Sequence, residues 1–202
     1  MAPTRAKNRR DRLILHAQQQ GWGLGYVDEC WFSRLAQPNL RAWSVAEPLR
    51  LSHKSLPKQD KTAKAISCYG LLLAKQDQML VRFCRGQPVS SVTRAFLGWI
   101  SEQLARRGVG VLVLFWDNAS WHISGEVRTW VKEHNRQVKK TGQGVRFLVH
   151  RLPSKSPWLN NIEPKWVHGK RAVVEPERVL SPEELASRVC GYYGCEHLDW
   201  LQ

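Results

Sequence analysis

Six apolar residues in succession, Val111 to Trp116, are the feature that most limits how this chain can fold. The run has the length of a strand, and an unbroken apolar strand is buried on both faces instead of alternating between core and solvent. A strand of this kind lies inside a sheet that has helices on each side. We therefore predict an α/β fold built around this run.

The rest of the chain supplies further strand and helix patterns. Four segments with strand character come first and are typical of an antiparallel run: residues 25–35, 40–45, 65–74 and 78–84. Apolar residues at helical spacing predict a crossover helix over residues 89–107. Beyond the central strand we expect a helix, a strand and a helix, over residues 124–140, 145–153 and 160–174. A last helix should open at Ser181, a good N-cap followed by proline.

A length of 202 residues fits one domain with a short appendage. Residues 1–22 are predicted to be a basic N-terminal arm or the remnant of a linker. The first twelve are polar and basic enough to be disordered, and residues 13–20 form at most a short helix. The globular domain then covers residues 23–202.

The charge of the chain points to a polyanionic partner. Lysine and arginine number 31 against 17 acidic residues, which gives a net charge of +14. A surface of this kind binds phosphates in a salt-sensitive way, although a basic protein need not bind nucleic acid. No apolar run is long enough to span a bilayer. The five cysteines form no C-x-x-C pair and no secretory segment follows Met1, so we expect reduced thiols and a cytoplasmic location.

Three carboxylates lie where strands end or a helix begins. Asp28 follows a short apolar strand, and Asp117 ends the central run. Either aspartate alone is more often a turn or cap residue. Glu163 falls in the first turn of a predicted helix, where the helix dipole by itself would favour a carboxylate. Only the combination indicates a site.

Together, these three carboxylates would suit hard divalent cations. They supply several oxygen ligands and leave coordination positions for water and phosphate, as Mg²⁺ prefers. Two such ions suit phosphoryl transfer, because one activates the attacking oxygen while the other stabilises the leaving oxygen.

Three blocks of sequence carry a resemblance to a known family. They are Tyr26-Val27-Asp28-Glu29, the segment WDNASWH at residues 116–122, and the segment LPSKSPWLNNIEPKW at residues 152–166. Together they resemble DDE transposases of the mariner superfamily, in particular the bacterial insertion-sequence branch. The resemblance covers most of the chain and implies a ribonuclease H-like mixed sheet, with antiparallel first strands and then parallel strands, flanked by helices.

The resemblance also implies roles for individual residues. Asp28, Asp117 and Glu163 would be the catalytic triad that binds two Mg²⁺ or Mn²⁺ ions, and Asn118 and His122 would line the site. Residues 23–202 would be the catalytic domain, which cleaves and joins DNA at the ends of an insertion sequence. A homodimer that pairs two ends, acting at the bacterial nucleoid, follows from the same resemblance.

The chain departs from the family pattern in three places. Asn161 stands where the family usually has proline. The 45 residues from Asn118 to Ile162 are a longer spacer than usual, with the surplus expected in a loop at residues 135–144. Relatives also carry helix-turn-helix domains before the catalytic domain, whereas 27 residues precede Asp28 here. Either a separate helix-turn-helix polypeptide recognises the DNA ends, or the element has decayed, and the sequence favours neither.

Further residues have two interpretations each. A cationic group near Glu163 would either contact the DNA backbone or form a solvated helix face. Its members are Lys155, Lys165, His168, Lys170 and Arg171. Glu29 should point to the opposite strand face from Asp28 and make a surface contact. Trp121 and Trp158 would either stack on an unpaired base or belong to the core, and the core is the safer interpretation.

These observations support a metal-dependent transposase as the main hypothesis. The alternative is a catalytically inactive, basic DNA-binding remnant or regulator of transposition. A ribonuclease H-like nuclease with a host function would share the chemistry but act without transposon ends.

Overall fold

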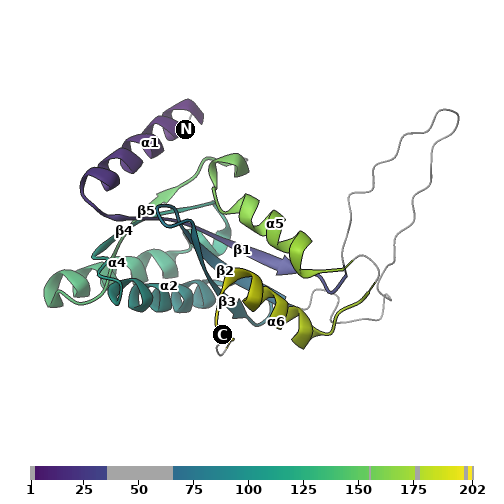
Figure 1. Cartoon of the computed structure of the whole chain (residues 1–202). Coiled ribbons are helices and arrows are strands. Elements are labelled where there is room, and N and C mark those ends of the chain that lie inside the picture. The colour runs from purple at the N-terminus through teal and green to yellow at the C-terminus, as the bar shows by residue number, and fades with distance from the viewer. Residues whose placement is uncertain (1–2, 36–65, 155, 176–177, 198–199, 202) are drawn as a thin grey trace, which may run out of the picture.

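A five-stranded mixed sheet forms the centre of the fold (Figure 1). The computed structural model describes residues 3–35, 66–154, 156–175, 178–197 and 200–201. Within these residues the strands lie in the order β3-β2-β1-β4-β5. Their bounds are Gly23–Phe32 for β1, Ile66–Leu73 for β2, Gln78–Cys84 for β3, Val111–Trp116 for β4 and Arg146–Arg151 for β5.

The sheet changes from antiparallel to parallel at β1. Strand β2 runs antiparallel to both β1 and β3, while β4 runs parallel to both β1 and β5. The unbroken apolar run is β4, which lies between β1 and β5 and is almost entirely buried. The predicted mixed sheet is therefore confirmed, and the strand predicted at residues 40–45 lies outside the described residues.

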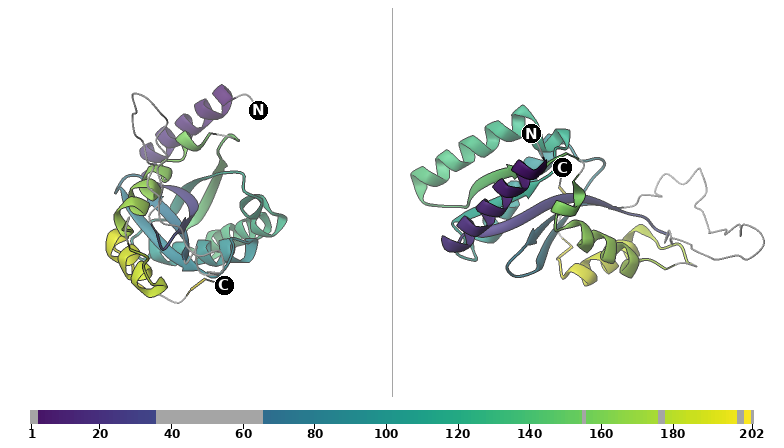
Figure 2. Two further views of the ribbon diagram at one scale, coloured as in Figure 1. Left: turned by 90° about the vertical axis from the view of Figure 1, so that its right-hand side faces the viewer. Right: turned by 90° about the horizontal axis from the view of Figure 1, so that it is seen from above.

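Helices cover both faces of this sheet (Figures 1 and 2). On one face lie α2 (Ser90–Ala105) and α4 (Gly125–Thr141). On the other lie α1 (Pro3–Gln19), α5 (Glu163–Val173) and α6 (Pro182–Tyr193). A short helix α3 (Ser120–Ile123) follows β4, and a 3₁₀ turn η1 (Pro157–Leu159) precedes α5.

Two helix ends show how local sequence sets the element bounds. The Ser181 hydroxyl accepts a hydrogen bond from the Glu184 backbone N–H at 3.1 Å, so the predicted start of α6 is confirmed. Helix α4 continues to Thr141 and stops where Gly142 adopts a left-handed conformation with φ of 71°. The loop predicted at residues 135–144 is therefore wrong for residues 135–141, because that basic segment consists mainly of good helix formers.

The N-terminal segment is also more ordered than predicted. Helix α1 begins at Pro3, so the disorder predicted for the first twelve residues is wrong. Basic and polar composition is typical of disordered segments, yet alanine, lysine, arginine and glutamine favour helix. Ala17 is buried in the core, and the Trp22 N–H donates to its carbonyl at 2.9 Å. Helix α1 thus belongs to the folded body.

All five cysteines are free thiols, and Cys30, Cys68 and Cys84 are buried. No helix in the described part of the chain is long and apolar enough to cross a membrane.

Candidate active site

Asp28 and Asp117 lie at the same level of two neighbouring parallel strands. In the register of β1 and β4, Tyr26 faces Phe115, and each aspartate follows two residues later. Because side chains alternate along a strand, Asp28 shares the sheet face of Tyr26, and Asp117 shares that of Phe115. The rings of Tyr26 and Phe115 stack with centroids 5.2 Å apart, in the core cluster that includes α5. The sheet therefore brings both carboxylates to one place beside α5.

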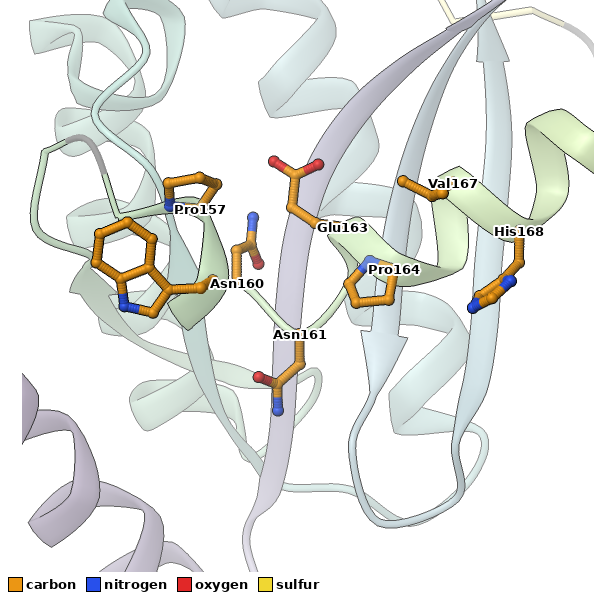
Figure 3. Close-up of a pocket in the computed structure, with 8 residues that line it drawn as sticks. Pro157, Asn160, Asn161, Glu163, Pro164, Val167 and His168 are labelled. Carbon is orange, nitrogen blue, oxygen red and sulfur yellow. The ribbon is translucent and has the colours of Figure 1, made fainter. Parts of the chain in front are cut away.

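Glu163 is the first residue of α5, and its carboxylate points away from the helix toward β1 (Figure 3). On the next turn, Trp166 is buried against β2, where Gly70 leaves room for its indole ring. A β-carbon at Gly70 would overlap that ring. Gly70 is also the residue that faces Asp28 in the register of β1 and β2. The contact between Trp166 and Gly70 thus holds the start of α5 close to Asp28.

The carboxylates influence one another's ionisation. Burial raises the pKa of Asp28 to about 8, with further increases from the charges of Glu29, Glu163 and Asp117. Burial also raises the pKa of Glu163, and the charge of Asp117 adds to this effect while Lys170 opposes it. The three predicted metal ligands are therefore near enough to repel one another.

Asp117 has the opposite electrostatic environment, although its strand position matches that of Asp28. Burial acts to raise its pKa, but hydrogen bonds from His122 and from the Ala119 backbone N–H lower it overall. The Ala119 N–H donates to Asp117 Oδ1 at 2.9 Å. Asp117 therefore stays ionised and half exposed at the end of β4.

His122 connects Asp117 to the other face of the sheet. Its Nδ1 lies 2.8 Å from Asp117 Oδ1, and its Nε2 lies 2.6 Å from Glu29 Oε1. Burial opposes protonation of this imidazole, yet the two carboxylates raise its pKa to about 9, so both ring nitrogens donate at neutral pH. The ring is fully buried and stacks on Trp116 at 5.0 Å. His122 thus holds Asp117 in a fixed orientation.

Glu29 is a functional candidate whose role sequence reasoning missed. Alternation along β1 correctly predicted that it points away from Asp28, into the cluster of Tyr69 and Cys84 that neighbours it. The predicted surface contact is wrong, because α3 returns over the end of the sheet and leaves only 6% of the Glu29 side chain exposed. No spacing rule relates Glu29 to His122, which lies 93 residues further along the chain.

Comparison with protein families decides how this arrangement is classified. The family described as DDE superfamily endonuclease matches residues 26–186, which include most of β1, the site residues, all of α5 and the start of α6. This chain belongs to that family. No curated protein sequence matches it.

Solved structures place the fold of this DDE domain among transposase catalytic domains. The Mos1 transposase paired-end complex with left transposon end matches with a TM-score of 0.65 and 15% identity, covering 96% of this chain and 55% of that one. The catalytic domain of Mos1 mariner transposase matches with a TM-score of 0.58 and 13% identity, covering 96% of this chain and 81% of that one. The chain therefore spans about half the length of the transposase in the first of these structures and has its ribonuclease H-like fold.

The donor chemistry of this DDE domain fits a divalent metal ion. Asp28, Asp117 and Glu163 offer only hard oxygen ligands, and a cation would relieve the repulsion that raises the pKa of Asp28. Among the described residues, no three His, Cys, Asp or Glu side chains are already gathered as a ligand group. Side-chain rotation would therefore have to bring the carboxylates to a common ion.

Asn118 has a defined structural role beside Asp117. Its Nδ2 donates to the Leu152 carbonyl at 2.7 Å. The Leu152 N–H in turn donates to the Trp116 carbonyl at 2.8 Å. These bonds join the ends of β4 and β5, so Asn118 fixes the loop that carries Asp117.

The predicted DNA-binding cations differ in their surroundings. Lys165 forms a 2.6 Å ion pair with Asp77 in the turn between β2 and β3. Lys170 and Arg171 are exposed on α5, and the charge of Lys170 reaches Glu163. Lys155 lies outside the described residues. Of the described cations, Lys170 thus has the clearest electrostatic link to the site.

Two hollows lie beside the carboxylates of the DDE domain. The first, which we call the α5 pocket, has a volume of about 480 Å³ and is lined by Trp158, Pro164, Val167 and Glu163 among others (Figure 3). Trp158 is 75% exposed there, so the core position preferred for it is wrong. The second has a volume of about 590 Å³ and is lined by Arg9, Arg128 and Arg151 among others, and we call it the arginine groove. It adjoins Asp117 through Asn118 and His122.

Proposed function

We propose that this chain is the catalytic domain of a DNA transposase of the mariner superfamily, in its bacterial insertion-sequence branch. It would hydrolyse a phosphodiester at the element end and then join the freed 3′-hydroxyl to target DNA. The observation that carries the proposal is the meeting of Asp28 and Asp117 at one level of two parallel strands, with Glu163 beside them. Membership of the DDE endonuclease family supports it.

In this proposal Asp28, Asp117 and Glu163 are the catalytic residues and hold two Mg²⁺ or Mn²⁺ ions. Their carboxylates are the hard ligands that these ions prefer. A related Mos1 mariner paired-end complex, with a TM-score of 0.65 and 14% identity, is described with Mn. When bound, the ions would activate the attacking oxygen and stabilise the leaving oxygen of an in-line displacement.

Other residues of the chain would position the reacting groups. His122 donates to Asp117 Oδ1 and leaves its second oxygen free to act as a ligand. Asn118 fixes the loop after β4. Lys155, Lys165, Lys170 and Arg171 are proposed to contact the DNA backbone, with Lys170 beside Glu163. A homodimer that pairs two ends completes the proposal.

The test is a substitution of Glu163 with a matched control on the surface. Glu163→Gln should abolish cleavage of element-end DNA in Mg²⁺ or Mn²⁺ while leaving fold and DNA affinity nearly unchanged, because only a ligand oxygen is altered. Glu102→Gln, at an exposed position of α2, should cleave like the wild type. Equal cleavage by the wild type and Glu163→Gln would refute the assignment.

A second candidate function is a DNA-binding remnant or regulator without catalysis. The observation that favours it is that the described carboxylates are not gathered as a ligand group. This alternative predicts salt-sensitive DNA binding. It also predicts no Mn²⁺ binding that depends on the three carboxylates, which titration calorimetry distinguishes from the transposase.

A further inference from the structure

The arginine groove is formed by three elements that are far apart in the sequence. Arg9 comes from α1, Arg128 from the start of α4 and Arg151 from the end of β5. All three residues are exposed. The groove therefore depends on α1, the segment expected from the sequence to be an arm.

In the part of the chain that the structure describes, the charge of the three arginines is not neutralised. Within the described residues, none of their side chains forms an ion pair or hydrogen bond with an acidic group. Other arginines of this chain are paired: Arg94 contacts Glu126, and Arg178 and Arg188 contact Glu175 and Glu184. Three cations that have no acidic partner among the described residues, gathered around one hollow, indicate that an anion binds there.

The groove is continuous with the proposed catalytic site. Asn118 and His122 line it. Asn118 directly follows Asp117 in the chain, and His122 forms a hydrogen bond with the Asp117 carboxylate. His150, at the floor, has a pKa lowered first by burial and then by the charges of Arg9 and Arg10. The aromatic residues Trp116 and His122 are buried and stacked on each other, so they offer no free ring face to a base.

We propose that the arginine groove binds the sugar-phosphate backbone of one DNA strand as it leaves the site at Asp117. Guanidinium groups match phosphate oxygens in pairs, and backbone contacts fix a strand's position without reading its sequence. This inference rests on the proposed function for the identity of the strand. It assigns α1 a part in substrate binding and adds Arg9, Arg128 and Arg151 to the residues that hold DNA.

The experiment compares two triple variants with equal loss of charge. The groove variant carries Arg9→Gln, Arg128→Gln and Arg151→Gln. The control variant carries Lys139→Gln, Lys140→Gln and Arg146→Gln, which lie at the opposite ends of α4 and β5. A third variant, with lysine at the three groove positions, keeps the charge and shows whether charge or folding explains a loss.

The measurement is the affinity for a fluorescent oligonucleotide, single-stranded or duplex, over a range of salt concentrations without divalent metal. Each phosphate contact removed lowers the slope of log affinity against log salt by about 0.7 to 0.9. For the groove variant, the slope of log affinity against log salt should therefore fall by about two in magnitude, and the affinity should fall more than tenfold. The control variant should lose less than one unit, and the lysine variant should keep most of the wild-type slope.

Equal losses of slope and affinity in the groove and control variants would overturn the proposal. So would a lysine variant that loses as much as the glutamine variant while circular dichroism shows both folded. Cleavage by the wild type, measured separately in Mg²⁺, keeps the two proposals distinct. If the wild type does not cleave DNA but only the groove variant loses salt dependence, the groove proposal holds and the transposase assignment fails. If the wild type cleaves DNA and the groove and control variants bind alike, the transposase assignment holds and the groove proposal fails.

Discussion

The ends of β1 and β4 carry the same residue type at the same level of the sheet, yet their surroundings differ. Asp28 is covered by α5 and lies among other carboxylates, so its pKa rises to about 8. Asp117 is half exposed and accepts hydrogen bonds from His122 and from a backbone N–H, so its pKa falls. Asp117 is a fixed, ionised carboxylate, whereas without a bound cation Asp28 stays mostly protonated near neutral pH.

This difference teaches that equivalent strand positions need not have equivalent roles. The structure beyond each strand decides the role: α3 returns His122 to Asp117, while α5 brings Glu163 towards Asp28. In the proposed mechanism Asp117 would attract the first ion, and Asp28 would release a proton as it becomes a ligand.

The largest effect is expected for the carboxylates themselves. Asp117→Asn and Asp28→Asn should each lower the rate of DNA cleavage by roughly a thousandfold or more, about 4 kcal/mol in activation free energy. Their stabilities should differ, because Asp28→Asn removes a buried, repelled carboxyl and should raise the thermal midpoint without metal. Cleavage assays and thermal melts on both variants check this, and an unchanged rate in either one would contradict it.

The next largest effect concerns the anchor of Asp117. His122→Ala would leave Glu29 buried without its partner, so the free energy of unfolding should fall by about 3–5 kcal/mol. His168→Ala, at an exposed position of α5, should change it by less than about 0.5 kcal/mol. Urea unfolding measures both variants, and similar stabilities would show that the bonds through His122 do not hold this end of the sheet.

The pH dependence of metal binding should report Asp28. Because a ligand carboxyl must lose its proton, affinity for Mg²⁺ should rise about tenfold per pH unit from pH 6 and level off near pH 8. Without metal, the stability of the fold should change with pH in the opposite direction. Because folding raises the pKa of Asp28, the contribution of this carboxyl to the free energy of unfolding is present below about pH 4 and is lost as pH rises through about 8.

Titration calorimetry at pH 6, 7 and 8 tests the metal-binding arm of that prediction. Asp28→Asn should bind with an affinity that no longer changes with pH over this range. A wild-type affinity that is constant from pH 6 to 8 would show that Asp28 is not a ligand.

The smallest effect tests how α5 is held beside Asp28. Gly70→Ala places a methyl group into the indole ring of Trp166, which should cost about 1–3 kcal/mol of stability and lower cleavage by displacing Glu163. Gly98→Ala in α2 has room for the added carbon and should be neutral or slightly stabilising. Chemical unfolding of the two variants compares them, and equal stability would contradict the role given to the Trp166 contact.

Strong local patterns in the sequence account for most of the fold that could be predicted. The apolar run of β4, the helical spacing of α2 and the Ser181 cap each determine structure within one element. Disorder was predicted for the first part of α1 because its basic composition resembles that of disordered segments, while the apolar contact at Ala17 is made with distant strands.

The candidate site was predictable where side chains follow strand periodicity. The common level of Asp28 and Asp117 follows from parallel pairing, once the strands are known. The link from Glu29 to His122, the ion pair of Lys165 with Asp77 and the exposure of Trp158 depend on how loops return over the sheet. Alternation and spacing carry no information about such returns, so only the three-dimensional structure reveals them.

The most direct test of the central claim is a calorimetric titration of the protein with Mn²⁺ at pH 8. The wild type is predicted to bind two ions, and the variant with Asp28→Asn, Asp117→Asn and Glu163→Gln is predicted to bind none while remaining folded. Binding that is the same in the two proteins would contradict the assignment of these three carboxylates as the metal-binding triad.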